Sequence, residues 1–186
     1  GAAFVYHGSS NGLDTAANWS QESNGAYDAM GRSVSTAGDV NGDGYDDVIV
    51  GVGLYTNGQG NEGQARIYHG GSNGLANTAS WKKEGNQKSA YYGSAVSNAG
   101  DVNNDGYSDV IIGASEYNSG QNSEGKAFVY QGSSSGTKNS ASWTGESDLK
   151  DGSFGKSVSS AGDLNNDGYD DIVVGAEDYY KGQTKG

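Results

Sequence analysis

Short apolar segments alternate with glycine-rich polar stretches along the whole chain, and this pattern returns every 62 residues. Residues 3–6 alternate small, aromatic and β-branched side chains, and residues 65–68 and 127–130 repeat the alternation. Segments of this kind, bounded by Gly/Ser/Asn turns, predict β-strands. Helical periodicity over a useful length is missing from the sequence. The chain is therefore predicted to be all-β.

The repeat tiles the chain without insertion or deletion as residues 1–62, 63–124 and 125–186. In all three copies 24 of the 62 columns are identical, so each copy should form the same structural unit. Each unit offers four strand-like segments, which is typical of one blade of a β-propeller. A solenoid is the main alternative for a repeat protein, but a parallel β-helix normally uses shorter coils. We interpret residues 1–186 as a single propeller-type domain.

The repeat boundaries do not coincide with the expected blade boundaries. If the strand that begins at Met30 and its equivalents is innermost, residues 30–84 and 92–146 form two whole blades. Residues 1–22 then supply the outer half of a blade and residues 154–175 an inner half. Propellers have ~4–8 blades, and the multiple of three in that range is six. We therefore predict a homodimer that closes one six-bladed ring and leaves no unpaired strand at the edge of a sheet. If the chain is excised from a longer one, the number of blades in the ring is not determined.

Composition narrows the function classes. The sequence has 33 glycines, no cysteine and a net charge of −12, so disulfides and thiolate sites are excluded. Such a negative field disfavours nucleic acid and anionic membranes as partners, and no apolar run approaches the ~20 residues of a membrane span. A visible signal peptide is also missing. We expect an extracellular or cell-surface protein in which Ca²⁺ takes the stabilising role of disulfides.

An acidic nine-residue segment occurs once in each repeat and accounts for 11 of the 23 acidic residues. Side-chain oxygens stand at positions 1, 3, 5 and 9, a glycine at position 6, and a backbone carbonyl is available at position 7. Oxygen-only, anionic ligands in alternation suit a hard cation such as Ca²⁺, and the lack of His and Cys disfavours Zn²⁺. The predicted ligands of three structural Ca²⁺ ions are Asp39, Asn41, Asp43, Tyr45 and Asp47; Asp101, Asn103, Asp105, Tyr107 and Asp109; Asp163, Asn165, Asp167, Tyr169 and Asp171.

An EF-hand is the alternative suggested by the first residues of this segment. An EF-hand requires Glu at position 12, where this chain has Val50, Ile112 and Val174. It also requires flanking helices, whereas a β-branched strand follows here. The EF-hand interpretation fails.

The combination resembles the FG-GAP repeat family, found in the propeller of integrin α subunits and in microbial surface proteins. The resemblance depends on Phe154-Gly155, the Asp-x-Asn-x-Asp-Gly-Tyr-x-Asp loop, and Gly175-Ala176 after the apolar strand. Two departures are visible: Met30 and Tyr92 replace the aromatic of the "FG" pair, and the proline of "GAP" is absent. In that family the Ca²⁺ loops support the blades and are not catalytic, so the resemblance implies a structural metal in a binding scaffold.

Other residues suggest binding or catalysis less strongly. The tryptophans could stack on sugars, although packing between blades explains them as well, and the tyrosines of the loop after the second strand are better candidates for a binding rim. A catalytic or metal role for the histidines is disfavoured because the third copy has Gln131. The glutamates recur one per blade, too far apart for the paired carboxylates of glycoside hydrolysis. The residues concerned are Trp19, Trp81, Trp143, Tyr55, Tyr117, Tyr179, His7, His69, Glu22, Glu84 and Glu146.

These observations predict a calcium-stabilised extracellular propeller that serves recognition, adhesion or assembly and is not an enzyme. A carbohydrate-binding lectin with sites repeated per blade is the first alternative. The second is an engineered or excised fragment that assembles with itself. A protein or glycan ligand is expected in the first two cases, and the sequence does not identify it.

Overall fold

The computed structural model describes residues 1–25 and 27–180, and their regular structure consists of β-strands. The strands are β1 (Ala2–Val5), β2 (Gly8–Ser9), β3 (Gly12–Leu13), β4 (Trp19–Glu22), β5 (Met30–Gly38), β6 (Asp47–Val52), β7 (Gln64–Tyr68), β8 (Trp81–Glu84), β9 (Ala95–Gly100), β10 (Asp109–Ala114), β11 (Lys126–Tyr130), β12 (Trp143–Glu146), β13 (Phe154–Gly162) and β14 (Asp171–Ala176). Within the described residues, no helix has the length and apolar character needed to cross a membrane. The prediction of an all-β chain is confirmed.

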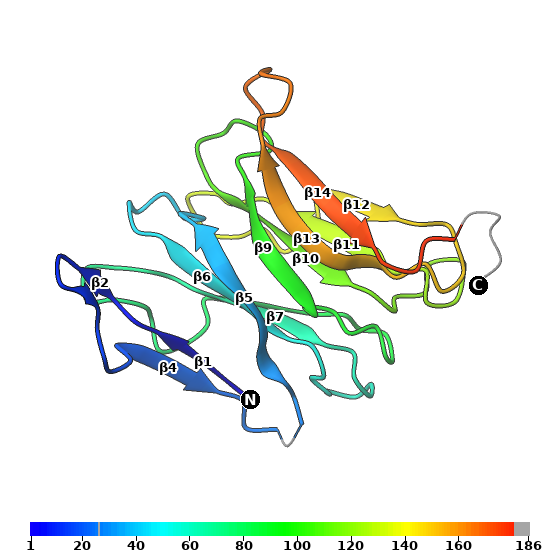
Figure 1. Ribbon diagram of the computed structural model, residues 1–186, viewed down its shortest axis with the longest axis horizontal. Helices are drawn as coiled ribbons and strands as arrows, with labels where there is room; N and C mark the ends of the chain where they lie inside the picture. Colours follow the sequence, from blue (N-terminus) through cyan, green and yellow to red (C-terminus); the bar gives the residue numbers. More distant parts are fainter. Residues whose placement is uncertain (26, 181–186) are drawn as a thin grey trace.

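Two four-stranded antiparallel sheets occupy the centre of the molecule (Figure 1). Their strand orders are β5-β6-β7-β8 and β9-β10-β11-β12, as in successive propeller blades. The first sheet has the bounds predicted from the sequence. The second begins at Ala95, three residues later than predicted. Tyr92 instead forms an isolated bridge with Gly63, and its N–H donates to the Glu62 carbonyl, so it belongs to the contact with the neighbouring sheet.

A two-stranded sheet lies on each side of this pair. Strands β1 and β4 form one, and β13 and β14 form the other, which matches the predicted outer and inner half-blades. A small hairpin, β2–β3, extends the β1–β4 unit where the sequence predicts only a turn. Among the described residues, β1 and β14 each have one edge with no strand paired to it.

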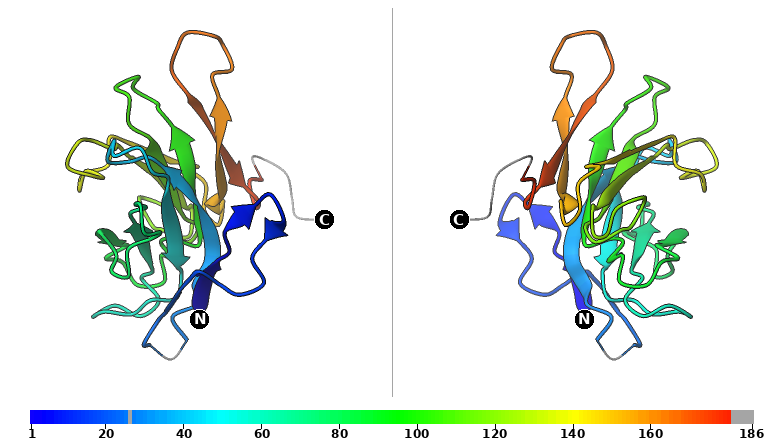
Figure 2. Two further views of the ribbon diagram at one scale, coloured as in Figure 1. Left: turned by 90° about the vertical axis from the view of Figure 1, so that its left-hand side faces the viewer. Right: turned by 90° about the vertical axis from the view of Figure 1, so that its right-hand side faces the viewer.

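Neighbouring sheets pack face to face through their innermost strands. Strand β5 packs on β9, and β9 packs on β13, so the sheets stand side by side (Figure 2). Strand β10 is buried over its whole length because other sheets cover both of its faces, whereas β14 is partly exposed throughout. Ile49, Ile67 and Ile112 contribute to the apolar layer between the two central sheets.

Trp81 closes the outer part of this layer. Its ring is 6% exposed and meets Tyr130 of the next sheet edge-on, with centroids 5.2 Å apart. We expect Trp81→Phe to lower the free energy of unfolding by about 1–2 kcal/mol, because a smaller ring leaves part of the space empty. Chemical denaturation would measure the change. Lys82→Ala, at the exposed neighbouring position, should stay within about 0.5 kcal/mol; equal losses for both variants would contradict this packing role.

Candidate metal centre

The three acidic segments form equivalent loops. They connect β5 to β6, β9 to β10 and β13 to β14, the two inner strands of each blade or half-blade. All three loops therefore leave the sheets at the same end, toward the top of Figure 2. Successive loops are bonded to each other: the Ser108 N–H donates to the Asp39 carbonyl at 3.0 Å, and the Asp170 N–H donates to the Asp101 carbonyl at 3.2 Å.

The aspartate at position 1 organises each loop. In the second loop, Asp101 Oδ1 accepts from the Asp105 N–H at 3.0 Å and Oδ2 accepts from the Gly106 N–H at 2.8 Å. Gly106 has φ +88°, a left-handed conformation that glycine adopts without the steric cost of a side chain. The first and third loops make the same two bonds, and their glycines have φ +87° and +91°. The sequence prediction of a sharp turn at position 6 is confirmed.

Positions 3 and 5 bring two more oxygen-bearing side chains into contact. Asn103 Oδ1 accepts from the Asp105 N–H, its Nδ2 donates to Asp105 Oδ2 at 3.0 Å, and Asp105 Oδ1 accepts from the Tyr107 N–H at 3.1 Å. The same contacts recur in the other two loops. Positions 1, 3 and 5 are thus fixed by the backbone of a loop that is open to solvent at position 5.

The aspartate at position 9 lies at the buried base of the loop. Asp109 is fully buried and accepts from Val102 N–H at 3.0 Å and from Gly132 N–H at 2.9 Å. Asp47 is equally buried and makes the corresponding two bonds, at 2.9 and 2.8 Å. Burial raises the pKa of Asp109 to about 6 and also raises that of Asp47. A nearby cation would stabilise the ionised form of a carboxylate that is removed from water in this way.

The third loop differs in one bond. Asp171 accepts from the Leu164 N–H at 2.9 Å, as its equivalents do from Val40 and Val102. In the first two loops, the second oxygen of the position 9 carboxylate accepts from the N–H of a glycine that follows the third strand of the same sheet. Within residues 1–25 and 27–180, Asp171 has no such glycine beside it, because no strand pairs with the other edge of β14 there.

The residues of each loop fit Ca²⁺ in their chemistry. They provide carboxylate and amide oxygens together with solvent access, and Ca²⁺ takes six to eight oxygen ligands, including water, in flexible geometry. The carboxylates are positioned by backbone N–H groups rather than gathered against one another. Among the described residues, three acidic side chains with oxygens within 4.8 Å of one another occur in a different place, at Glu124, Glu146 and Asp148.

This acidic cluster was not predicted from the sequence, and two of its members, Glu124 and Glu146, already have partners. Glu124, 1% exposed, accepts from the Ser119 and Gln121 N–H groups. Glu146 pairs with Lys126 at 3.0 Å, and hydrogen bonds from Ser119 and Lys126 lower its pKa. The expectation of a local structural partner for Glu146 is confirmed. The sequence signal for this cluster is the acidic residue that ends repeats one and two, Glu62 and Glu124.

The aromatic candidates for ligand binding are largely used in packing. Trp19 and Trp81 are each 6% exposed, whereas Trp143 is 42% exposed. The rim tyrosines of the first two repeats are partly buried: the Arg66 guanidinium lies 5.7 Å from the ring centroid of Tyr55. In the second repeat, the Lys126 ammonium lies 5.8 Å from the ring of Tyr117.

The histidines face turns of the following repeat. A side chain on Gly74 would touch the ring of His7, and one on Gly136 would touch that of His69. The His69 side chain is partly buried, whereas that of His7 is exposed.

The strand and loop pattern has a match among known families. The FG-GAP repeat pattern matches residues 30–68, and the FG-GAP-like repeat pattern matches residues 101–174. The chain carries FG-GAP repeats. The matched FG-GAP regions lie in the two central sheets and extend into β13 and β14, and they contain all three acidic loops.

The proteins to which this chain is similar in sequence include integrin alpha subunits. Integrin alpha-6 of Homo sapiens is 32% identical over 154 residues, which cover 82% of this chain and 13% of that protein. Integrin alpha-IIb of Mus musculus is 35% identical over 155 residues, covering 79% and 15% respectively. Integrin alpha-V of Gallus gallus is 30% identical over 188 aligned positions, covering 95% and 17%. The chain spans less than a fifth of the length of these curated relatives.

The packing between sheets explains why Met30 and Tyr92 can replace the phenylalanine of the "FG" pair. Met30 is 3% exposed and Tyr92 is 1% exposed, and both pack in the cores between sheets. The position requires a large apolar side chain that fits beside the preceding sheet, and Met, Tyr and Phe all meet that requirement. The replacement of phenylalanine therefore leaves the blade intact.

Proposed function

We propose that this chain is a calcium-stabilised β-propeller segment that serves as an extracellular recognition or adhesion scaffold and has no enzymatic activity. The supporting observation is the threefold recurrence of one loop geometry, in which Asp, Asn and Asp side chains at positions 1, 3 and 5 are fixed above a buried or half-buried Asp at position 9. The chemistry of these loops suits a structural cation, and it offers no nucleophile and base held in contact.

The role of the metal in this proposal follows from the position of the loops. Each loop joins the two innermost strands of a blade and bonds to the next loop through the backbone. A Ca²⁺ ion held by Asp101, Asn103, Asp105 and Asp109 would supply positive charge between groups that otherwise repel. The residues of the chain would fix the loop ends of β9 and β10 to each other and to the neighbouring blade.

Recognition is the part of the proposal that the relatives support by analogy. The sequence similarity lies with integrin alpha subunits, and a rigid fan of blades presents loops at both ends of its sheets for contacts with other molecules. The lectin alternative depended on the exposed faces of repeated aromatic residues. Arg66 lies over the ring of Tyr55, and Lys126 lies over that of Tyr117, so the repeated tyrosines do not present a uniform set of exposed aromatic faces. The third tyrosine, Tyr179, is 47% exposed.

Calcium titration of single-loop variants tests the metal sites. Isothermal titration calorimetry of the chain stripped of metal should give three Ca²⁺ per chain. Asp105→Ala should reduce the number to two, because it removes a ligand that lies on the solvent side of the loop and leaves the buried base intact. Asn104→Gly is the matched control, since the first loop has Gly42 at this position, and it should retain three sites.

Two results would overturn the metal assignment. One is the absence of Ca²⁺ binding by the wild-type chain at millimolar Ca²⁺. The other is an unchanged stoichiometry in Asp105→Ala, which would place the ion outside the loop.

A further inference from the structure

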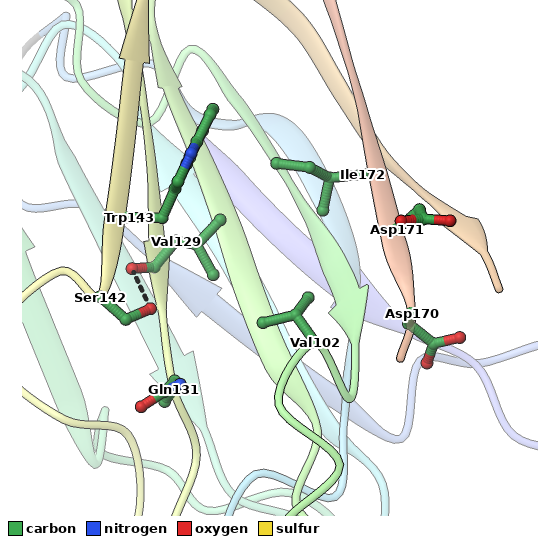
Figure 3. Close-up of a pocket in the computed structure, with 8 residues that line it drawn as sticks. All are labelled: Val102, Val129, Gln131, Ser142, Trp143, Asp170, Asp171 and Ile172. Atoms are coloured by element: carbon green, nitrogen blue, oxygen red, sulfur yellow. Dashed lines mark hydrogen bonds between the residues drawn. The ribbon is translucent and has the colours of Figure 1, made fainter. Parts of the chain in front are cut away.

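A pocket of about 390 Å³ opens beside the edge of β14 (Figure 3). Trp143 of β12 forms one wall and Ile172 of β14 forms the opposite wall, with Val129 between them at the base. The pocket therefore lies between the last complete sheet and the inner half-blade. It is the place where a third strand would follow β14 if that half-blade were complete.

The equivalent place is filled twice inside this chain, each time by a tyrosine on the third strand of the next sheet. Trp19 meets Tyr68 of β7 with ring centroids 4.9 Å apart at 71°, and Trp81 meets Tyr130 of β11 at 5.2 Å and 63°. Both tyrosines are 3% exposed. The third tryptophan of the series, Trp143, has no ring contact of this kind among the described residues, and it is exposed instead.

The missing tyrosine is present at the other end of the chain. Tyr6 stands 62 residues before Tyr68, directly after β1, and is 47% exposed. Strand β1 pairs with β4 on one side and has an open edge on the other. The chain thus presents both halves of one contact, the pocket beside β14 and the side chain that fits it, on two separate edges.

We propose that the occupant of this pocket is a second copy of the chain, whose β1 adds to β14 in antiparallel pairing, and that two copies close a ring through two such seams. The assembly partner of the proposed scaffold would thus be another copy of itself. The expected effect of Ca²⁺ on this pairing rests on the proposed function. The internal pairs β6–β7 and β10–β11 have the same register, displaced by 62 residues. That register predicts the pairs Ile172–Tyr6, Val173–Val5, Val174–Phe4, Gly175–Ala3 and Ala176–Ala2 across the seam.

A second aromatic contact is divided in the same way. Inside the chain, Phe128 is met edge-on by Tyr92 at 5.4 Å and by Tyr117 at 5.7 Å. The residues 62 positions after these tyrosines are Phe154 and Tyr179, on the half-blade that carries β14. The residue equivalent to Phe128 is Phe4 on β1, which is 56% exposed. One seam would therefore bury aromatic rings contributed by both copies.

The second copy would also complete the third acidic loop. Gly70 and Gly132 donate their N–H groups to the position 9 aspartates of the first two loops, and Gly8 is their equivalent in the first repeat. Gly8 of the second copy would therefore reach Asp171. The Asp46 N–H of the second copy would likewise reach the Asp163 carbonyl, as Ser108 reaches Asp39. The third metal site is incomplete without this partner.

Charge makes the assembly depend on the cation. Each copy carries a net charge of −12, so two copies repel one another in the absence of bound cations. Three Ca²⁺ per copy would halve that charge, and one of the three would lie at each seam. We therefore expect the paired form in Ca²⁺ and a shift toward single chains in chelator.

Light scattering after size-exclusion chromatography tests the assembly on the 186-residue chain. In millimolar Ca²⁺ the expected mass is twice 19.1 kDa. Trp143→Ala and Gly175→Ala should each raise the dissociation constant of the dimer at least about tenfold. Within one chain, a methyl group on Gly175 overlaps only the Ser157 hydroxyl, which can rotate away. At the equivalent position inside the chain, a methyl group on Gly51 would overlap the Gly93 carbonyl of the next blade, so Gly175→Ala should clash in the same way with the second copy. Thr144→Ala is the matched control, because this position is exposed in every repeat, and its dissociation constant should not change.

The register has its own test because the chain contains no cysteine. Mixing Val173→Cys with Val5→Cys should give a disulfide-linked dimer under mild oxidation, since directly paired residues lie within the range of a disulfide. Mixing Val173→Cys with Ala3→Cys, two residues out of register, should give at most about a tenth of that product.

The outcomes separate this inference from the proposed function. A chain that binds three Ca²⁺ and stays at 19.1 kDa overturns the ring and leaves the metal function in place. Species that grow in mass with concentration overturn closure by two copies. A dimer that forms without binding Ca²⁺ supports the seam and contradicts the metal sites. Equal cross-linking of both cysteine mixtures overturns the register and with it the proposed seam.

Discussion

Gly113→Ala is expected to lower the free energy of unfolding by about 3 kcal/mol, the upper end of the usual cost of overpacking, although it adds a single methyl group. Gly113 lies in β10, where a Cβ atom would overlap the backbone carbonyl oxygen of Gly155 in β13. The φ of Gly113 lies outside the left-handed region, so the cost comes from this overlap and not from backbone strain. Overpacking against backbone atoms cannot be relieved by a rotamer change, and the sheets would have to separate locally.

Thermal unfolding in saturating Ca²⁺ measures this effect. For a chain of this size, 3 kcal/mol corresponds to a decrease of about 6–12 °C in Tm. Gly60→Ala is the matched control: it is exposed, has no heavy atom within 4 Å of the added Cβ, and does not have a left-handed φ. Its Tm should stay the same or rise slightly, because alanine restricts the unfolded chain. A Tm for Gly113→Ala equal to that of the control would show that the sheets are not in this close backbone contact.

The sequence predicted the blade arrangement because the same local pattern occurs three times. The strand segments, the turn glycine of each acidic loop and the division into two whole and two half blades all follow from a 62-residue period combined with strand alternation. Only short-range information is needed for these features. A strand of alternating side chains and a loop of fixed composition form the same local structure in every repeat.

Features that join different repeats could not be predicted in the same way. The start of β9 at Ala95 depends on Tyr92 being held by Glu62 of the preceding sheet. The second bond to Asp47 comes from Gly70, 23 residues away, and the acidic cluster around Glu124 depends on how two separate segments fold together. These contacts depend on side-chain direction and on the distance between sheets, which composition and period do not specify.

The exposure of Trp143 is the clearest example. All three tryptophans occupy the same position of the repeat, so the sequence predicts one role for all three, either packing between blades or stacking on a sugar. The structure buries Trp19 and Trp81 and exposes Trp143, because burial depends on the strand pair that follows each of them in space. Packing between blades is therefore correct for Trp19 and Trp81 but not for Trp143, and the difference arises at the open edge of the sheet array.

Removal of calcium should have the largest effect on stability. We expect EDTA to lower the Tm by about 15–30 °C. At Ca²⁺ concentrations about 100 times Kd, each site contributes about 2.7 kcal/mol, so three sites contribute about 8 kcal/mol. For a chain of 186 residues, each kcal/mol corresponds to about 2–4 °C. Without the cations, 11 aspartates remain in three loops, and the buried Asp47 and Asp109 lose a compensating charge.

Scanning calorimetry in excess Ca²⁺, in EDTA, and in EDTA followed by excess Ca²⁺ would measure this change. The third sample should recover the Tm of the first, which separates metal loss from irreversible unfolding. A triple variant with alanine at Asp43, Asp105 and Asp167 supplies the matched control, because these residues lie on the solvent side of their loops. Its Tm should be low and should not respond to EDTA, since no site is left to empty. A wild-type melt that is the same in Ca²⁺ and in EDTA would mean that the loops stabilise the sheets through their hydrogen bonds alone, and the structural-metal proposal would then be wrong.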